Sequence, residues 1–158
     1  MKPKTILISL GVAAAFLVLG TRKAFANVVN DQQFRGCDGF GCGAFGESRT
    51  GHSHQGVDIV VKKGQQVVSP ISGTVTRFPF PYGDDLRYTG IEIKNNQYSI
   101  KIFYVNPVVS IGTKVSRGEG IATAQDIAAK YGNGMTNHIH IEVRETNTGL
   151  LLDPTKLF

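Results

Sequence analysis

The chain has 158 residues, of which 41% are hydrophobic, 18% are charged and 19 are glycine. This length can hold one globular domain with a buried core and leaves no room for a second. The net charge is +5, but four of the 17 basic residues and none of the 12 acidic residues lie in residues 1–26. The remaining chain is nearly neutral, which argues against nucleic acid as a partner, because nucleic-acid binding needs clustered Lys and Arg.

An apolar segment opens the chain and predicts an N-terminal apolar helix. Two lysines precede a run over residues 6–19, which is shorter than the roughly 20 residues that span a bilayer. Ala24-Phe25-Ala26 then offers a cleavage pattern. We expect residues 1–26 to be either a signal peptide cleaved at Ala26 or a membrane anchor retained through residues 5–20. Both outcomes predict an exported protein that is periplasmic, extracellular, or associated with a virion or membrane.

Residues 27–49 are rich in polar residues and glycine, and we expect an irregular arm. The arm carries both cysteines of the chain, Cys37 and Cys42. In an exported protein, two cysteines this close in sequence are expected to form a disulfide that closes a short loop. The alternative is a pair of zinc thiolates, which would need two further ligands nearby.

Residues 50–158 form the predicted domain, and short alternating segments predict antiparallel strands in it. The strongest signal is a hairpin of residues 90–94 and 98–104 around Asn95-Asn96-Gln97. Two prolines make residues 78–85 a loop. One short helix is expected over Ala124–Tyr131. The prediction is a mainly β domain with a small antiparallel sheet core; its other expected strands are residues 57–61, 67–70, 74–76 and 138–144.

The four histidines form two pairs, His52-Ser53-His54 and His138-Ile139-His140, and Asp58 follows the first pair closely. Residues i and i+2 of a strand point to the same face, so His138 and His140 should share one side of the sheet. Imidazole and carboxylate are ligands that zinc accepts, and three of them leave a fourth position open. The pattern predicts a zinc site.

We predict that His54, Asp58 and His140 bind Zn²⁺ and that His138 moves protons. Bound zinc lowers the pKa of water to about 7, while amide hydrolysis also needs a proton-transfer group. His52 lies in a Gly/Ser-rich loop and is expected to be exposed and outside the ligand set. Glu142 continues the face of the histidines, and we expect it either to support a ligand or to lie on the surface.

The segments His54–Asp58 and His138–Arg144 resemble the lysostaphin-type zinc metallopeptidases, which cut peptides of peptidoglycan. Residues 68–75, the turns of residues 112–121 and Asp153-Pro154 also look like that family. The resemblance implies the family's small antiparallel, barrel-sandwich-like sheet core, with zinc in a groove. It also assigns the same three ligands and gives His138 the catalytic role.

The segments Cys37–Gly43, His54–Asp58 and Phe103–Pro107 look similar to the leukocyte cell-derived chemotaxin branch of this superfamily, whose members are secreted zinc-binding signalling proteins. Active lysostaphin-type enzymes usually carry a further histidine in a Tyr-x-His pattern, and here the matching position is Asn106. We expect Asn106 to donate a neutral hydrogen bond at the catalytic site, with weakened activity as the consequence.

Two functions follow. The first is a zinc endopeptidase that acts on peptidoglycan peptides outside the cytoplasm. The second is a catalytically weak or silent zinc-binding protein that recognises an extracellular protein partner.

Overall fold

A computed structural model describes residues 24–158. The predicted apolar helix, with its attachment segment of residues 5–20, lies outside the described residues. Within residues 24–158, no helix is long and apolar enough to cross a membrane. The described chain is mainly β, as predicted, with several antiparallel sheets and one short α-helix, α1 (Ala128–Tyr131).

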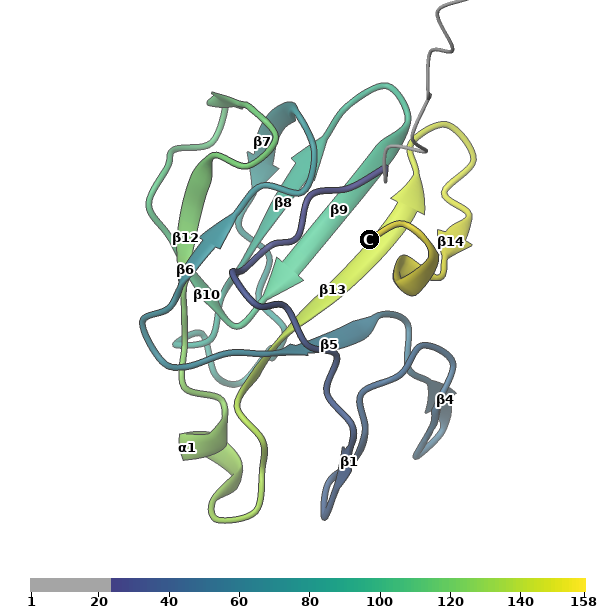
Figure 1. Ribbon diagram of the computed structural model, residues 1–158, viewed down its shortest axis with the longest axis vertical. Coiled ribbons are helices and arrows are strands. Elements are labelled where there is room, and N and C mark those ends of the chain that lie inside the picture. The colour runs from purple at the N-terminus through teal and green to yellow at the C-terminus, as the bar shows by residue number, and fades with distance from the viewer. Residues whose placement is uncertain (1–23) are drawn as a thin grey trace, which may run out of the picture.

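The largest sheet has seven antiparallel strands, and its centre is the pair β9 (Tyr98–Phe103) and β13 (His138–Glu145). Figure 1 shows these two long strands lying side by side across the molecule, with β5 beside the beginning of β13. β5 (Val57–Val60) pairs with β13 on the edge opposite β9. The other strands of this sheet are β7 (Gly73–Arg77), β8 (Gly90–Lys94), β11 (Lys114–Val115) and β14 (Leu151–Leu152).

A second, three-stranded sheet has the order β10 (Val105–Pro107), β12 (Gly120–Ala124) and β6 (Gln66–Val68). β10 follows β9 after a single residue, so the chain leaves one sheet and enters the other at this corner. The hydrophobic core contains apolar side chains from both sheets. Its fully buried members include Val57, Ile59, Val67, Val75, Ile91, Ile93, Ile100, Ile102, Val105, Ile121, Ile139, Ile141 and Val143.

The predicted hairpin is confirmed by β8 and β9, whose strands pair from Gly90 opposite Phe103 to Lys94 opposite Ser99. The Asn95 side chain accepts hydrogen bonds from the backbone N–H groups of Gln97 and Tyr98 at 2.9 and 2.8 Å and so closes the turn.

The predicted helix over Ala124–Tyr131 begins four residues late. Ala124 is the last residue of β12, and α1 starts only at Ala128. Asn137 accepts hydrogen bonds from the backbone N–H groups of Ile127 and Ala128 at 2.8 and 3.3 Å, and Oδ1 of Asp126 accepts from that of Ala129 at 3.0 Å. A distant and a local side chain therefore fix the beginning of the helix together. A 3₁₀ helix over Pro154–Lys156 was not predicted.

The arm is more ordered than its composition predicts. It contains the small hairpin of β1 (Cys37–Asp38) and β2 (Gly41–Cys42), and its last two residues form β3 (Ser48–Arg49), which pairs with β4 (His52–Ser53) just beyond the arm. In Figure 1 the labels β1 and β4 lie at the same end of the molecule as α1. Before these hairpins the chain packs along the core, where Phe25 is 1% exposed and lies edge-on to Tyr98, with ring centroids 5.1 Å apart.

Candidate metal centre

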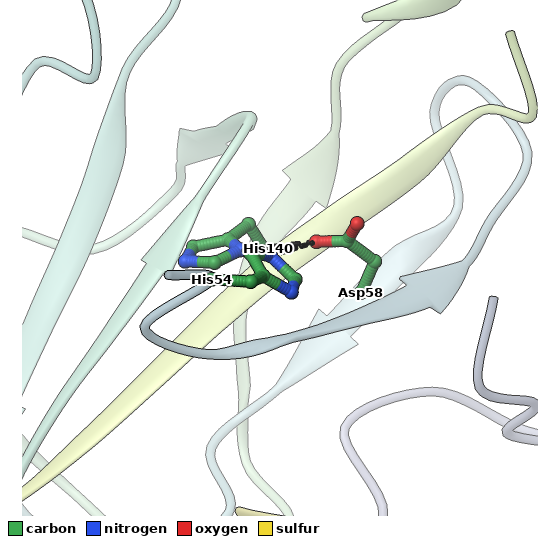
Figure 2. Close-up of side chains that lie close together, drawn as sticks. All are labelled: His54, Asp58 and His140. Carbon is green, nitrogen blue, oxygen red and sulfur yellow. Dashed lines mark hydrogen bonds and ion pairs between the residues drawn. The ribbon is translucent and has the colours of Figure 1, made fainter. Parts of the chain in front are cut away.

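Two neighbouring strands and the turn before one of them bring three side chains together. Asp58 in β5 lies directly opposite His140 in β13, so the strand register places their side chains side by side. His54 lies in the short segment between β4 and β5. One potential ligand atom from each of the three residues lies within 4.8 Å of the other two. Figure 2 shows both imidazoles and the Asp58 carboxylate converging on one another.

The donor set fits a divalent metal ion. Nε2 of His54 lies 2.9 Å from Nδ1 of His140, and Oδ1 of Asp58 lies 3.2 and 2.9 Å from these two nitrogens. Two ring nitrogens and one carboxylate oxygen are the ligand types of catalytic zinc sites. The opposite nitrogen of His54, Nδ1, donates to the carbonyl oxygen of Ala44 at 2.7 Å, which leaves the lone pair of Nε2 facing the cluster.

A carboxylate also lies near the other ring nitrogen of His140. This nitrogen, Nε2, lies 3.7 Å from Oε1 of Glu142, whose other oxygen accepts from the Lys101 ammonium at 3.1 Å. Burial alone would raise the pKa of Glu142, but the contacts with His140 and Lys101 outweigh it and lower that pKa to about 2. Glu142 is therefore ionised and supports a ligand, which is one of the two roles predicted for it.

Gly56 allows the turn of the first motif to approach β13. A Cβ atom at this position would lie 2.1 Å from the carbonyl oxygen of Ile141 and 2.8 Å from two ring atoms of His140. The glycine in the sequence His54-Gln55-Gly56-Val57-Asp58 is therefore a steric requirement of the site.

The negative charge of Asp58 is stabilised by its neighbours in the cluster. Burial would raise the pKa of Asp58, which is 2% exposed, but its close contacts with the imidazoles of His140 and His54 hold that pKa far below its usual range. Burial would lower the pKa of His140, and contacts with Asp58 and Glu142 raise it instead. The carboxylate is thus ionised and ready to bind a cation.

His138 lies beside this cluster without joining it. Its Nδ1 donates to the carbonyl oxygen of Thr136 at 2.7 Å, and its Nε2 lies 3.7 Å from Oδ2 of Asp58. Burial lowers the pKa of His138, so the neutral ring presents a free lone pair on Nε2. This is the protonation state that a general base needs.

The cluster lies in a groove of about 660 Å³. One of the groove's walls is aromatic, and the hydroxyl of Tyr82 lies 3.3 Å from that of Tyr104 and 2.9 Å from that of Tyr131. The ring of Tyr104 also stands edge-on to His138, with centroids 5.6 Å apart. The residues that line the groove are Arg35, Phe40, Arg49, His52, His54, Gln55, Asp58, Phe80, Pro81, Tyr82, Phe103, Tyr104, Ile127, Tyr131, Met135, His138, His140 and Glu142.

The structure separates two other predicted residues from the cluster. His52 is exposed at the groove, where its ring contacts only the carbonyl oxygen of Thr50, consistent with its predicted place outside the ligand set. Asn106 does not line the groove; its side chain accepts a hydrogen bond from Gln125 at 2.9 Å in a separate surface hollow. The placement of Asn106 therefore gives no support to the catalytic role predicted for it.

The predicted disulfide between Cys37 and Cys42 is present. Two contributors to the site were not predicted. Arg35 donates from the arm to Asp58, and no spacing or motif marked this residue. Tyr104 was noted only as part of the Tyr-x-His comparison, although a non-glycine φ of 65° sets it apart in the structure.

Comparison with known proteins agrees with this geometry. The model of peptidase family M23 matches residues 52–154. The chain belongs to peptidase family M23. The M23 family consists of metallopeptidases, typically with zinc, and the cluster of His54, Asp58 and His140 lies within the matched residues.

Relatives of this M23 protein include one that is named as a chemotaxin and others that are named as peptidases. It is 32% identical to leukocyte cell-derived chemotaxin-2 of Mus musculus over 146 residues, which cover 90% of this chain and 93% of the relative. It is 25% identical to a zinc-containing peptidase from Vibrio cholerae, with a TM-score of 0.61 over 84% of this chain and 40% of that one. The catalytic domain of lysostaphin from Staphylococcus simulans shares the fold, with a TM-score of 0.53 and 21% identity over 75% of this chain and 88% of that one.

Proposed function

We propose that this M23 protein is a zinc-dependent endopeptidase that hydrolyses peptide bonds of peptidoglycan outside the cytoplasm. The observation that carries the proposal is the placement of His138 beside the cluster of His54, Asp58 and His140 in an open groove. Three ligands leave a coordination position open, and a neutral histidine next to it can act as a base.

The three ligands would hold the ion, which when bound supplies an acidified water and polarises the substrate carbonyl. Nε2 of His138 accepts the proton of the attacking water and then returns it to the leaving amine. The bond from Nδ1 of His138 to Thr136 holds the ring orientation and keeps the Nδ1 proton in place, so that Nε2 is the atom that gains and loses the proton. Burial of the ring strengthens these electrostatic interactions, because little water competes for Nε2.

The groove is suited to an extended peptide. Its volume of about 660 Å³ falls in the range of ligand sites, and its aromatic wall offers both apolar faces and hydroxyl groups. The disulfide between Cys37 and Cys42 supports a location outside the cytoplasm, since such bonds persist in oxidising compartments. Peptidoglycan peptides are the substrate class that combines this location with the family's chemistry.

Digestion of purified peptidoglycan tests the proposal, with the released peptides identified by mass spectrometry. Wild-type protein with one bound zinc per chain should release fragments, and His138→Ala should abolish release while retaining zinc. Asn96→Ala is the control, because Asn96 is exposed at the turn between β8 and β9, outside the groove lining, and its removal should leave the rate unchanged. Zinc-loaded wild type that releases nothing across the accessible pH range would refute the peptidase.

The second candidate is a zinc-stabilised extracellular recognition protein with little or no peptidase activity. Two observations favour it: the chain covers 93% of leukocyte cell-derived chemotaxin-2, and Asn106 stands where active enzymes usually carry another histidine, yet lies outside the groove. In this case zinc removal should lower the melting temperature while peptidoglycan stays intact. Turnover that is abolished by His138→Ala would exclude the second candidate.

A further inference from the structure

A buried arginine from the arm contacts the metal site. Arg35 is 5% exposed, and its backbone N–H donates to the carbonyl oxygen of Asp58 at 2.8 Å. Its side chain then reaches the same residue, because Nη1 donates to Oδ2 of Asp58 at 2.9 Å. The other carboxylate oxygen, Oδ1, faces His54 and His140. One oxygen of Asp58 is therefore held by Arg35 and the other is left for the ligand cluster.

The guanidinium is itself held from the far side. Nε of Arg35 donates to Oδ2 of Asp38 at 3.1 Å, and Nη2 donates to Oδ1 of the same carboxylate and to the carbonyl oxygen of Gly41 at 3.0 Å. Asp38 and Gly41 belong to the loop closed by the disulfide. With contacts from all three nitrogens, the planar guanidinium has one orientation, and its remaining edge points at Asp58.

The same loop residue also reaches the base. Oδ2 of Asp38 accepts a hydrogen bond from the backbone N–H of Thr136 at 2.9 Å, and the carbonyl oxygen of Thr136 accepts from His138. Asp38 thus connects to the ligand Asp58 through Arg35 and to His138 through Thr136. A contact that only attached the arm to the sheet would not require both connections.

We propose that Arg35, oriented by Asp38, is a positioning residue for the metal ligand Asp58. By occupying Oδ2, it restricts Asp58 to binding through Oδ1 alone and keeps the fourth coordination position free for water or substrate. The inference rests on the zinc site of the proposed function. It adds a residue outside the ligand set, contributed by a segment that precedes the matched family region of residues 52–154.

The charge of Arg35 and its positioning role predict opposite changes in zinc affinity when Arg35 is removed, so the direction of the measured change tests the proposal. A positive charge next to a ligand repels a divalent cation, and its removal should tighten zinc binding if charge alone mattered. If Arg35 positions the ligand, its removal should weaken binding, because loss of a partner that orients a ligand typically costs about 10–100-fold in metal affinity.

The experiment measures zinc affinity at pH 7 by competition with a chromophoric chelator, for the wild type and Arg35→Met. Methionine keeps most of the apolar volume and removes the charge and the donors. We expect a dissociation constant that is about 10–100-fold higher. Arg87→Met is the matched control, because Arg87 also donates from two guanidinium nitrogens to one carboxylate, that of Asp85, but lies outside the groove lining and donates to no metal ligand. Its affinity should equal that of the wild type.

Two further variants separate orientation from charge. Arg35→Lys keeps the charge but cannot donate to Asp58, Asp38 and Gly41 together, so its affinity should lie closer to that of Arg35→Met. Asp38→Asn should also weaken zinc binding, and the double variant Arg35→Met/Asp38→Asn should be no weaker than Arg35→Met alone, since both changes disrupt one device. Circular dichroism and melting curves of the metal-free proteins show whether each variant is folded.

Cobalt(II) in place of zinc gives a readout that a purely structural role would not affect. At saturating cobalt, the visible absorption bands report ligand geometry, and they should change in Arg35→Met and stay unchanged in Arg87→Met. Equal or tighter zinc binding by Arg35→Met, or full recovery by Arg35→Lys, would overturn the proposal. A wild type that binds no zinc would instead overturn the proposed function, so the two failures are distinguishable.

Discussion

Gly56→Ala should disrupt both the fold and the metal site through one methyl group. In the structure a Cβ atom at this position would lie 2.1 Å from the carbonyl oxygen of Ile141. An ordinary contact between carbon and oxygen needs about 1 Å more than this, so β5 and β13 must move apart at their shared end. Overpacking of this kind costs about 1–3 kcal/mol, which for a domain of this size lowers the melting temperature by about 2–12 °C.

The same methyl group would also meet the ring of His140 at 2.8 Å and push it away from the cluster. We therefore expect zinc affinity to fall about tenfold or more, in addition to the loss of stability. Differential scanning calorimetry and chelator competition measure the two effects. Gly83→Ala is the control, since no atom lies within 4 Å of a Cβ built on that exposed glycine. A Gly56→Ala protein that melts and binds zinc like Gly83→Ala would refute the packing argument.

Three further changes have distinct expected results. Free zinc at 100 times its dissociation constant should stabilise the wild type and His52→Ala by about 2.7 kcal/mol in thermal melts, but should leave His140→Ala unaffected. An equal shift in all three proteins would show that the ion does not bind at His140. Burial would raise the pKa of Glu92, but hydrogen bonds from an arginine and two hydroxyl groups outweigh burial and lower that pKa. The ionised Glu92 therefore stabilises the fold fully above the unfolded pKa of about 4.3, and this stabilisation is lost as the pH falls through the lower pKa of the folded state. In urea unfolding at pH 7, Glu92→Gln should therefore lower the free energy of unfolding by about 1.5–3 kcal/mol, and by less at acidic pH. The exposed control Glu47→Gln should change it little, and a loss for Glu92→Gln that does not depend on pH would contradict the reasoning. In the chain that retains residues 1–26, Phe25→Ala should cost about 3–5 kcal/mol in the same assay because Phe25 is fully buried, and an unchanged stability would show that this segment does not pack as described.

The sequence was most informative where one strand decides the geometry. Alternation along residues 138–144 placed His138 and His140 on one face, and in β13 the intervening Ile139 and Ile141 are both fully buried. The hairpin of β8 and β9 was equally predictable, because its turn and both alternating segments are contiguous. These features depend on residues that are close in sequence.

Features that depend on distant partners could not be predicted in this way. The beginning of α1 depends on Asn137 as well as on the local acceptor Asp126, and the alanines near residue 124 read as helical although Ala124 pairs with Val105 in a strand. Arg35 lies 23 residues before Asp58, in an arm without any regular pattern. Only the folded chain shows that this polar segment packs against the metal site.

Asn106 follows a corner where the chain passes from one sheet to the other, and a motif comparison alone does not say where its side chain points. Tyr104 is the single residue between β9 and β10, and its φ of 65° is a left-handed conformation that costs about 1–2 kcal/mol for a residue with a side chain. Both Tyr104 and Val105 donate their backbone N–H groups to the carbonyl oxygen of Thr89, at 2.8 and 3.2 Å. This kink interrupts the alternation of β9, so Val105 enters the core and Asn106 points to solvent.

The aromatic ring of Tyr104, and not the side chain of Asn106, consequently lies beside His138 in the groove. It follows that Asn106→His should not supply the missing histidine: the peptidoglycan hydrolysis rate of this variant should equal that of the wild type, because position 106 lies in a separate hollow. The comparison needs equal zinc content in both proteins. A rate increase of about tenfold or more would show that position 106 reaches the reacting groups. The kink at Tyr104 would then not explain the difference between this chain and the Tyr-x-His enzymes.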